Sequence, residues 1–288
     1  MSIQWYPGHM TKARRLIEEA MPKQDVVIEV LDARMPSASE NPLVTEIRGR
    51  KPCVKVLSKS DLADPVTTKA WIKHLEAFSG GGPVLAIAIT QKNATDTRTR
   101  IPEACKRLAT HPSGPGKTVR AMVVGIPNVG KSTLINTLMD RKVAKVGDEP
   151  AVTKSQQLVM LKSGMALSDN PGILWPKIED ADASLRLALG GAMPDNAIDY
   201  ETVALFGLRH FLARHPNLLI GRYKLKQTPK DEHEALDEIG RRRGCLRAGG
   251  VVDLHKASDM FIHDFRDGVF GPVSLEEPDD GFSAPVTA

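Results

Sequence analysis

The chain has 288 residues, enough for one large or two smaller domains, and 41% of them are hydrophobic. No apolar run approaches the length of a membrane-spanning helix, so no membrane-spanning segment is expected. The formal net charge of +4 permits a polyanionic partner without requiring one.

The first half of the chain alternates predicted helices with predicted strands. The strands are short apolar runs of the kind that is buried on both faces in a parallel sheet. They are expected over 26–31, 53–57 and 84–89. The helices are expected over 11–21, 66–78 and 101–109, the last with Pro102 in its first turn.

A Pro/Gly linker is predicted over 111–116, followed by a strand over 119–124 and a helix over 132–139. Two further strands, 157–161 and 165–168, are expected to form a hairpin that turns at Ser163 and Gly164. Strands that alternate with helices in this way predict an α/β fold with a mostly parallel sheet.

The pattern changes after residue 175, where strand signals end. Helices are predicted over 183–189, 200–213, 232–242 and 256–266. We therefore expect an α/β domain over 1–175 and a small all-helical domain over 176–275. Residues 276–288 combine Pro, Gly and acidic side chains, and this composition predicts a disordered acidic tail.

A phosphate-binding loop is the strongest motif in the chain. Gly125-Ile-Pro-Asn-Val-Gly-Lys-Ser-Thr133 has the G-x-x-x-x-G-K-S pattern between a predicted strand and a predicted helix. Backbone N–H groups and the helix N-terminus would hold the phosphates, Lys131 would reach the β- and γ-phosphates, and Ser132 would ligate Mg²⁺. The expected nucleotide contacts are Asn128, Val129, Gly130, Lys131, Ser132 and Thr133.

Two later segments complete a site that responds to the γ-phosphate. Asp169-Asn-Pro-Gly172 follows a predicted strand as a D-x-x-G motif, in which Asp169 would bind Mg²⁺ through water and the Gly172 N–H would contact the γ-phosphate. Thr153 is the candidate switch threonine, closing over Mg²⁺ and the γ-phosphate. The alternatives are an ordinary turn at 169–172 and a loop threonine with no role.

A base-recognition motif precedes the phosphate loop. In Ser58-Lys-Ser-Asp61, the Asp61 carboxylate could accept hydrogen bonds from guanine N1–H and N2–H₂, and the Lys59 stem would lie along the base. Adenine cannot offer that pair of donors. In most GTPases this motif follows the phosphate loop, so the order here predicts a circular permutation: base recognition, fifth motif, phosphate loop, switch threonine, D-x-x-G.

Motif order and residues together resemble the ribosome biogenesis GTPase A (YlqF) group of circularly permuted GTPases. The matching segments are Trp5-Tyr-Pro-Gly-His-Met-Thr-Lys-Ala-Arg-Arg15, Asp32-Ala-Arg-Met-Pro36, Asn41-Pro42, Gly125–Thr133, Asp169-Asn-Pro-Gly-Ile-Leu-Trp-Pro-Lys177 and Gly244-Cys-Leu-Arg-Ala-Gly-Gly250. The resemblance implies a Ras-like P-loop GTPase domain, permuted and followed by a helical domain.

The same resemblance implies GTP or GDP with Mg²⁺ as ligands and leaves a K⁺ requirement open. It implies the large ribosomal subunit and its rRNA as partners during late assembly, and a monomer away from the ribosome. The N-terminus has neither a secretory signal nor room for a transit peptide, so a bacterial cytoplasmic protein is expected rather than a mitochondrial one.

The chain departs from the family at two base-binding positions. Ser58 stands where members usually have Asn, and we expect the lost carboxamide to weaken nucleotide affinity while Asp61 keeps the preference for GTP. The fifth motif normally carries a Ser and reads guanine O6 with a backbone N–H; here Ala88 and Ile89 lie nearest its place.

Catalysis is expected to be slow without a partner. Ile173 follows Gly172 where many GTPases have a water-orienting Gln, and an apolar side chain cannot orient water. The resemblance points to His9 as the catalytic group, with Lys131 and Thr153, although His9 could equally be a surface or RNA-contact residue.

The leading hypothesis is a GTPase switch that binds and releases the large ribosomal subunit. Through residues 173–176, with Trp175 as pivot, the D-x-x-G motif would connect directly to the helical domain. The rival hypothesis is an RNA-binding assembly scaffold with GTP as a structural ligand; a P-loop ATPase or small-molecule kinase is a distant third. Candidate rRNA contacts are Lys12, Arg14, Arg15, Arg241, Arg242, Arg243 and Arg247.

Overall fold

The computed structural model describes residues 7–77, 81–109, 118–140, 157–169, 178 and 180–278, with the side chains of the first helix described from residue 14 onwards. The predicted linker at 111–116, together with Thr153 and Gly172, lies outside these residues. None of the helices in the described ranges is long and apolar enough to cross a membrane.

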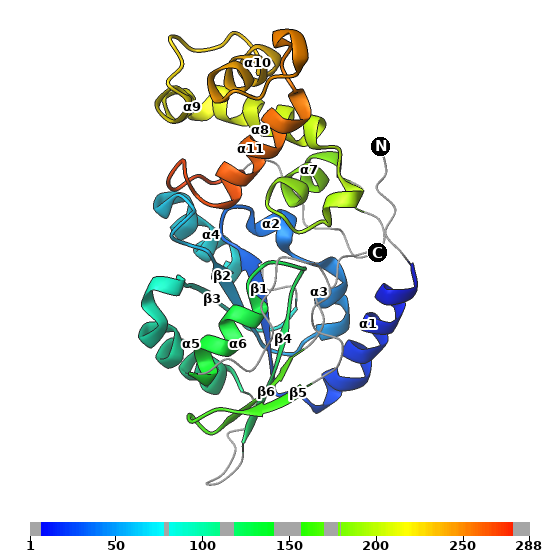
Figure 1. The fold of residues 1–288 in the computed structure, drawn as a ribbon. Coiled ribbons are helices and arrows are strands. Elements are labelled where there is room, and N and C mark those ends of the chain that lie inside the picture. The colour runs from blue at the N-terminus through cyan, green and yellow to red at the C-terminus, as the bar shows by residue number, and fades with distance from the viewer. Residues whose placement is uncertain are drawn as a thin grey trace.

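A single six-stranded sheet forms the centre of the α/β region, in the order β3-β2-β1-β4-β6-β5 (Figure 1). Its strands are β1 (Val26–Asp32), β2 (Cys53–Ser58), β3 (Val84–Ala88), β4 (Val119–Val124), β5 (Gln157–Met160) and β6 (Met165–Asp169). All adjacent pairs are parallel except β5 and β6, which form the predicted antiparallel hairpin. The α/β fold with a mostly parallel sheet is therefore confirmed.

The pairing of β1 with β4 joins the two halves of the chain. Val26 is in register with Ala121, so the strand that leads to the phosphate loop lies beside the first strand of the chain. Every residue of β1 is buried, and so is every residue of β4 except Arg120, as their apolar runs predicted. This is the arrangement that a circular permutation requires, because the base-recognition half and the phosphate half share one sheet.

Helices cover both faces of the sheet. On one face, α1 (Pro7–Ala20), α3 (Pro42–Arg48) and α4 (Pro65–Ala77) pack against alternate strand residues such as Val27 and Leu31. On the other, α5 (Ala94–Leu108) and α6 (Lys131–Met139) pack against Ile28 and Val123. This alternation follows from the period of two in a strand.

The helical region lies beyond the carboxyl ends of the strands and contacts the sheet domain through the short helix α2 (Pro36–Ser39) (Figure 1). Its helices are α7 (Ala181–Leu189), α8 (Tyr200–Arg214), α9 (Pro216–Tyr223), α10 (Glu232–Arg243) and α11 (Leu254–Arg266). Its centre contains a group of aromatic side chains in edge-to-face or tilted contact: Phe211, Phe261, Phe265 and Phe270.

Among the predicted boundaries that differ from the structure, two have a clear physical reason. The helix expected over 101–109 begins at Ala94, because the Asn93 side chain caps it by accepting from Asp96 N, and Pro102 therefore lies inside the helix. The predicted acidic tail also begins too early. Glu276 is 1% exposed, and its carboxylate accepts from the backbone N–H groups of Ser37 and Ala38 at the start of α2.

Residues 273–277 form a C-terminal strap between the two regions. Val273 N donates to Leu62 O and Leu275 N donates to Arg34 O, both in the sheet domain. On the helical side, Arg186 Nε donates to Leu275 O. The backbone of Val273 and Leu275, at the end of the predicted helical domain, therefore bridges two loops that are distant in sequence.

Candidate functional site

The phosphate-loop motif forms the predicted strand–loop–helix. β4 ends at Val124, and α6 begins at Lys131 with Gly130 at its N-cap in a left-handed conformation, φ 102°. Gly125 has φ 146°, and a Cβ there would lie 2.5 Å from the Val30 carbonyl oxygen, so only glycine fits. The turn brings the helix N-terminus to the carboxyl edge of the sheet, where it can bind an anion.

Lys131 is 8% exposed and its side chain folds back over the loop. Its Nζ donates to Ile126 O at 2.6 Å. A lysine held in this position can exchange a backbone carbonyl for phosphate oxygens with little movement of its stem. Ser132 and Thr133, in the first turn of α6, are half-buried.

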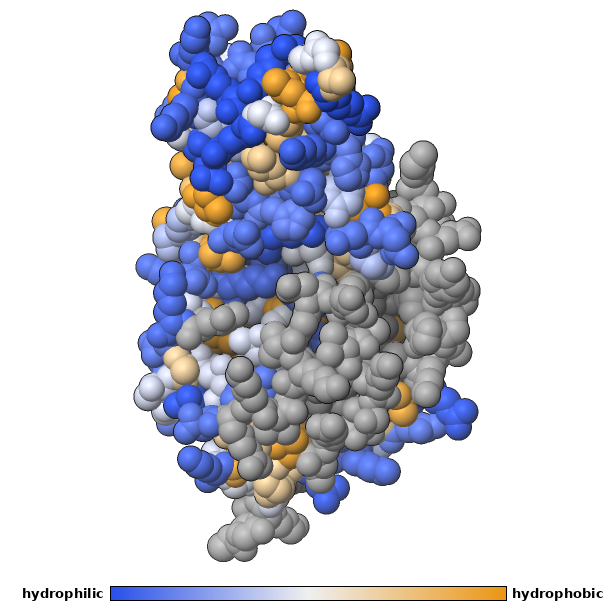
Figure 2. Space-filling view, viewed as in Figure 1, coloured by the Kyte–Doolittle hydropathy of each residue, from blue (hydrophilic) through white to orange (hydrophobic). Residues whose placement is uncertain are grey.

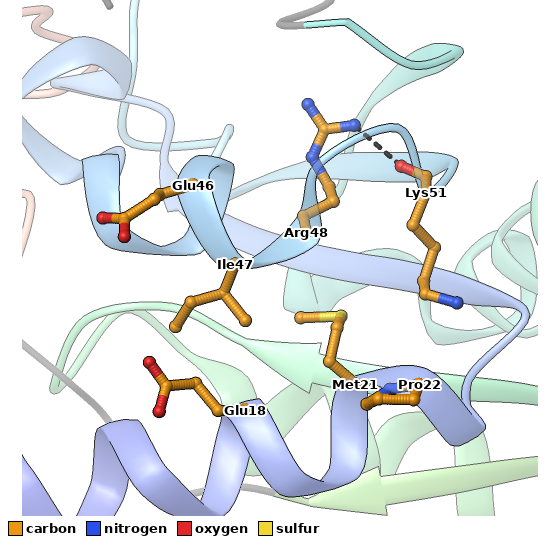
Figure 3. Close-up of a pocket in the computed structure, with 7 residues that line it drawn as sticks. All are labelled: Glu18, Met21, Pro22, Glu46, Ile47, Arg48 and Lys51. Atoms are coloured by element: carbon orange, nitrogen blue, oxygen red, sulfur yellow. Dashed lines mark hydrogen bonds between the residues drawn. The ribbon is translucent and has the colours of Figure 1, made fainter.

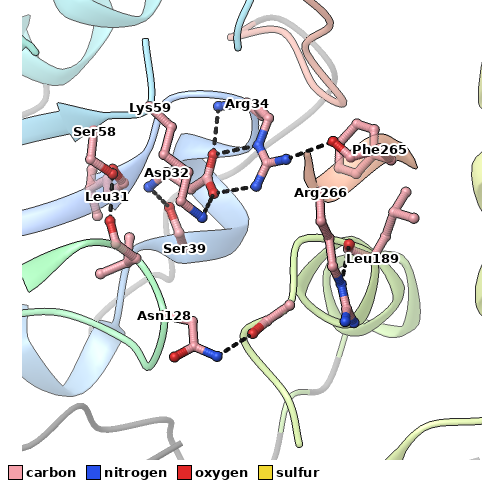
Figure 4. Close-up of polar contacts among 12 residues, drawn as sticks. Leu31, Asp32, Arg34, Ser39, Ser58, Lys59, Asn128, Leu189, Phe265 and Arg266 are labelled. Carbon is pink, nitrogen blue, oxygen red and sulfur yellow. Dashed lines mark hydrogen bonds and ion pairs between the residues drawn. The ribbon is translucent and has the colours of Figure 1, made fainter. Parts of the chain in front are cut away.

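The base-recognition loop leaves β2 beside the phosphate loop. Ser58 Oγ lies 2.9 Å from Leu31 O and 2.5 Å from Val129 O, and its single proton serves these two carbonyls (Figure 4). We expected Ser58 to lose the tie that Asn provides between the two loops. The hydroxyl keeps part of that tie, because it reaches the phosphate loop directly.

Lys59 and Asp61 follow at the same edge of the sheet. Lys59 has φ 54°, a left-handed conformation, and its Nζ lies 2.8 Å from Asp32 Oδ2. Asp61 is ion-paired with Lys92 at 3.2 Å, but Lys92 is exposed, so this pair is weak and leaves the carboxylate available to a base.

The predicted fifth-motif residues lie at the end of β3, which stops one residue earlier than the predicted strand. Ala88 is the last residue of β3, and the Ile89 carbonyl accepts from both the backbone N and the Oγ of Ser60. The loop that contains Asp61 is therefore fixed to the loop that contains Ala88 and Ile89. These contacts bring the two predicted base-binding segments together.

The described backbone brings Ser132 and Asp169, two of the predicted Mg²⁺ ligands, to the same edge of the sheet. Asp169 ends β6 in register with Val123 of β4, just before the phosphate loop. A hydroxyl and a carboxylate beside bound phosphates are the oxygen ligands that Mg²⁺ uses. No group of three His, Cys, Asp or Glu residues that could hold a metal occurs within the described ranges.

Four predicted site residues lie outside the described side chains, and of Asp169 only the backbone at the end of β6 is described. Thr153 and Gly172 lie outside the described residues. The backbone of His9 belongs to the first turns of α1. The role of each remains a prediction from the sequence.

A pocket of about 440 Å³ lies between α1 and α3 (Figure 3). It is lined by Glu18, Met21, Pro22, Glu46, Ile47, Arg48 and Lys51. Lys51 donates to Gln24 O, so the pocket lies near the amino ends of β1 and β2. It is therefore at the opposite edge from the phosphate loop and is not the nucleotide site.

Sequence reasoning missed the polar group behind Lys59. Asp32 and Arg34, both 1% exposed, form a buried ion pair next to the base-recognition loop. Asn128 Nδ2 also donates to Gly191 O at 2.9 Å, joining the phosphate loop to the helical region (Figure 4). A signal for Asp32 existed, since a carboxylate at the end of a parallel strand lies at the ligand-binding edge.

Comparison with known proteins also indicates a GTPase. Residues 120–206 match a family model described as 50S ribosome-binding GTPase. Ribosome biogenesis GTPase A of Bacillus licheniformis is 43% identical over 97% of this chain and 100% of its own length. The chain belongs to the ribosome biogenesis GTPase A family. The GTPase of Thermotoga maritima with the same name is 32% identical over 96% of this chain and 95% of its own length.

Solved structures of this family have the same fold. The GNP-bound YlqF of T. maritima is 27% identical, has a TM-score of 0.63, and the match covers 93% of this chain and 99% of that one. The mitochondrial ribosome-associated GTPase 1 of Bos taurus is 32% identical over 94% of this chain and 88% of its own length. As a ribosome biogenesis GTPase A, this chain is a P-loop GTPase that binds guanine nucleotides.

Removing the Ser58 hydroxyl is expected to weaken GDP binding about three- to tenfold in Ser58→Ala, because one buried hydrogen bond contributes about 0.5–1.5 kcal/mol. Equilibrium titration with a fluorescent GDP analogue measures the change. Ser60→Ala is measured beside it for comparison, because it also removes one hydroxyl from the same loop, the one that donates to Ile89 O. Unchanged affinity in Ser58→Ala would show that the contact with Val129 O does not support the site.

Proposed function

We propose that this chain is a GTP-hydrolysing assembly factor whose nucleotide state controls binding to and release from the large ribosomal subunit. The observation that carries the proposal is the pairing of β1 with β4. It brings Asp61 and the phosphate loop to one edge of one sheet, although the motifs are in permuted order. The family name and the matching 50S ribosome-binding GTPase model support the choice of partner.

In the proposed mechanism, the phosphates are held by the phosphate loop and the first turn of α6, which supply Asn128, Val129, Gly130, Lys131, Ser132 and Thr133. The base is held by Lys59, Asp61, Ala88 and Ile89. Mg²⁺, bound by Ser132, Thr153 and Asp169, would neutralise charge on the phosphates. Gly172 would respond to the γ-phosphate. His9 would orient the attacking water.

We propose that the helical region contacts rRNA. We also propose that residues 1–175 and 176–275 form two domains. Away from the ribosome, the protein would be a monomer. Figure 2 shows mostly hydrophilic residues over the helical region on the face in view. Several candidate arginines already have acidic neighbours: Arg241 is paired with Asp237 and Arg247 with Asp253. Binding to phosphates would have to compete with these exposed pairs, which are weak. The bacterial cytoplasm is the proposed location.

The decisive experiment measures GTP turnover with and without purified large ribosomal subunits, together with co-sedimentation in GTP, GDP and a non-hydrolysable analogue. We expect faster turnover on the subunit and stronger co-sedimentation with the analogue than with GDP. Equal turnover and nucleotide-independent binding would favour the scaffold alternative. His9→Ala tests the catalytic group: retained stimulation with unchanged binding would contradict its role.

A further inference from the structure

The carboxylate of Asp32 is held by two cationic side chains (Figure 4). Its Oδ1 accepts from the backbone N and the Nε of Arg34, each at 3.0 Å. Its Oδ2 accepts from Arg34 Nη2 at 2.8 Å and from Lys59 Nζ at 2.8 Å. Both oxygens are thus occupied, and the position of Lys59 depends on a carboxylate that Arg34 holds in a fork.

Arg34 also contacts the end of α11. Its Nη1 donates to Phe265 O at 3.3 Å, and its guanidinium carbon lies 4.7 Å from the centre of the Phe265 ring. The Arg34 carbonyl accepts from Leu275 N in the C-terminal strap at 2.7 Å. One residue therefore contacts the carboxylate behind Lys59, the last helix and the strap.

Asp32 and Arg34 are buried, and the Asp32 carboxylate interacts with the charges of both Arg34 and Lys59. Burial alone would raise the pKa of Asp32, but Arg34 and Lys59 outweigh burial and hold that pKa well below its usual range. The carboxylate therefore stays ionised. If Arg34 were displaced, the buried charge would lose its main partner, and Lys59 would lose its fixed counter-ion.

We propose that Asp32 and Arg34 are positioning residues that hold Lys59 for the guanine base, and that α11 sets guanine affinity through Phe265 and Arg34. The inference rests on the guanine-binding role of Lys59 proposed above. The coupling acts in both directions. A partner that binds α11 and moves it changes guanine affinity, and guanine binding changes the affinity for that partner by the same coupling free energy.

The test separates base binding from phosphate binding. GDP and inorganic tripolyphosphate, both with Mg²⁺, are titrated calorimetrically into the full chain and into Arg34→Lys and Phe265→Leu. Arg34→Lys keeps the charge but loses the fork, and Phe265→Leu loses the ring over the guanidinium while keeping the carbonyl. We expect GDP affinity to fall about tenfold and about threefold, respectively, with tripolyphosphate affinity within about twofold of the unmodified chain.

Tyr223→Phe is the matched control. It removes a buried hydrogen bond to Asp264, the residue before Phe265 in α11, but does not touch Arg34. GDP affinity should stay within about twofold of the unmodified chain in this control. GDP and tripolyphosphate affinities that fall together would overturn the inference, because that result indicates a general loss of structure. Unchanged GDP affinity in both Arg34→Lys and Phe265→Leu would also overturn it.

Lys59→Met distinguishes this inference from the proposed function. Weaker GDP binding in Lys59→Met with no effect of Arg34→Lys or Phe265→Leu would keep Lys59 in the guanine site and reject its coupling to α11. Unchanged GDP binding in Lys59→Met would reject the guanine-binding role itself, and the inference with it.

Discussion

Asp61→Asn is expected to weaken GTP binding about a hundredfold and to let the site accept XTP. Guanine presents two donors, N1–H and N2–H₂, and the Asp61 carboxylate can accept both. An Asn amide offers one acceptor and one donor, so its N–H₂ would face the guanine N2–H₂. Leaving such a group unpaired in a buried site costs about 2.7 kcal/mol, which is the expected hundredfold. Xanthine carries an oxygen at that position and would restore the pairing.

Equilibrium titrations with fluorescent analogues of GTP, XTP and ATP measure the change in selectivity. Asp64→Asn is the matched control, since it makes the same charge change three residues further along. Asp64 Oδ1 accepts from the backbone N–H groups of Val66 and Thr67 at the start of α4. Asn is an equally good cap, so this variant should keep its GTP affinity. GTP affinity that Asp61→Asn does not change would contradict the assignment of the guanine site.

The strands were predictable from the sequence because parallel strands buried on both faces are continuous apolar runs. β4 agrees with its prediction at both ends, and β1 and β2 extend one residue further. The short helices α2, α3 and α9 were missed. Each is too short to display a helical period, and only the Asn41 cap and Pro42 mark the start of α3.

The loops of the site were predictable because each carries its chemistry in a few consecutive residues. The phosphate loop needs Gly125 and Gly130 for backbone geometry and Lys131 for charge, and all lie within one short segment. Asp32, Arg34 and Phe265 belong to distant segments and meet through tertiary packing alone. The local sequence around each residue carries no signal for these long-range tertiary contacts.

At Glu276 the composition of the sequence led to a wrong prediction of disorder. A Pro- and acid-rich end of a chain predicts disorder because it offers little apolar surface to bury. Here the Glu276 carboxylate accepts backbone N–H groups at the start of α2, and its carbonyl accepts from Trp71 Nε1. These polar contacts order the segment, and no apolar pattern was available to reveal them.

Lys131→Ala is expected to lower the rate of GTP hydrolysis at least about a hundredfold, even when the site is saturated with nucleotide. Lys131 lies at the start of α6 with its ammonium over the phosphate loop. From there it can stabilise charge that develops on the β- and γ-phosphates during cleavage. A preorganised donor of this kind typically contributes a factor of about 10²–10³ to kcat. The substitution should leave α6 intact, because alanine is the best helix former.

Single-turnover phosphate release at saturating GTP measures the chemical step, and titration with a GDP analogue measures binding separately. Lys106→Ala is the matched control, since Lys106 Nζ also donates to a backbone carbonyl, that of Ser163, but on the exposed surface. Its hydrolysis rate should equal that of the unmodified chain. If Lys131→Ala hydrolyses GTP at the same rate once saturated, Lys131 contributes only to binding. The charge on the transferring phosphate would then have to be neutralised by Mg²⁺ and by a group from the partner.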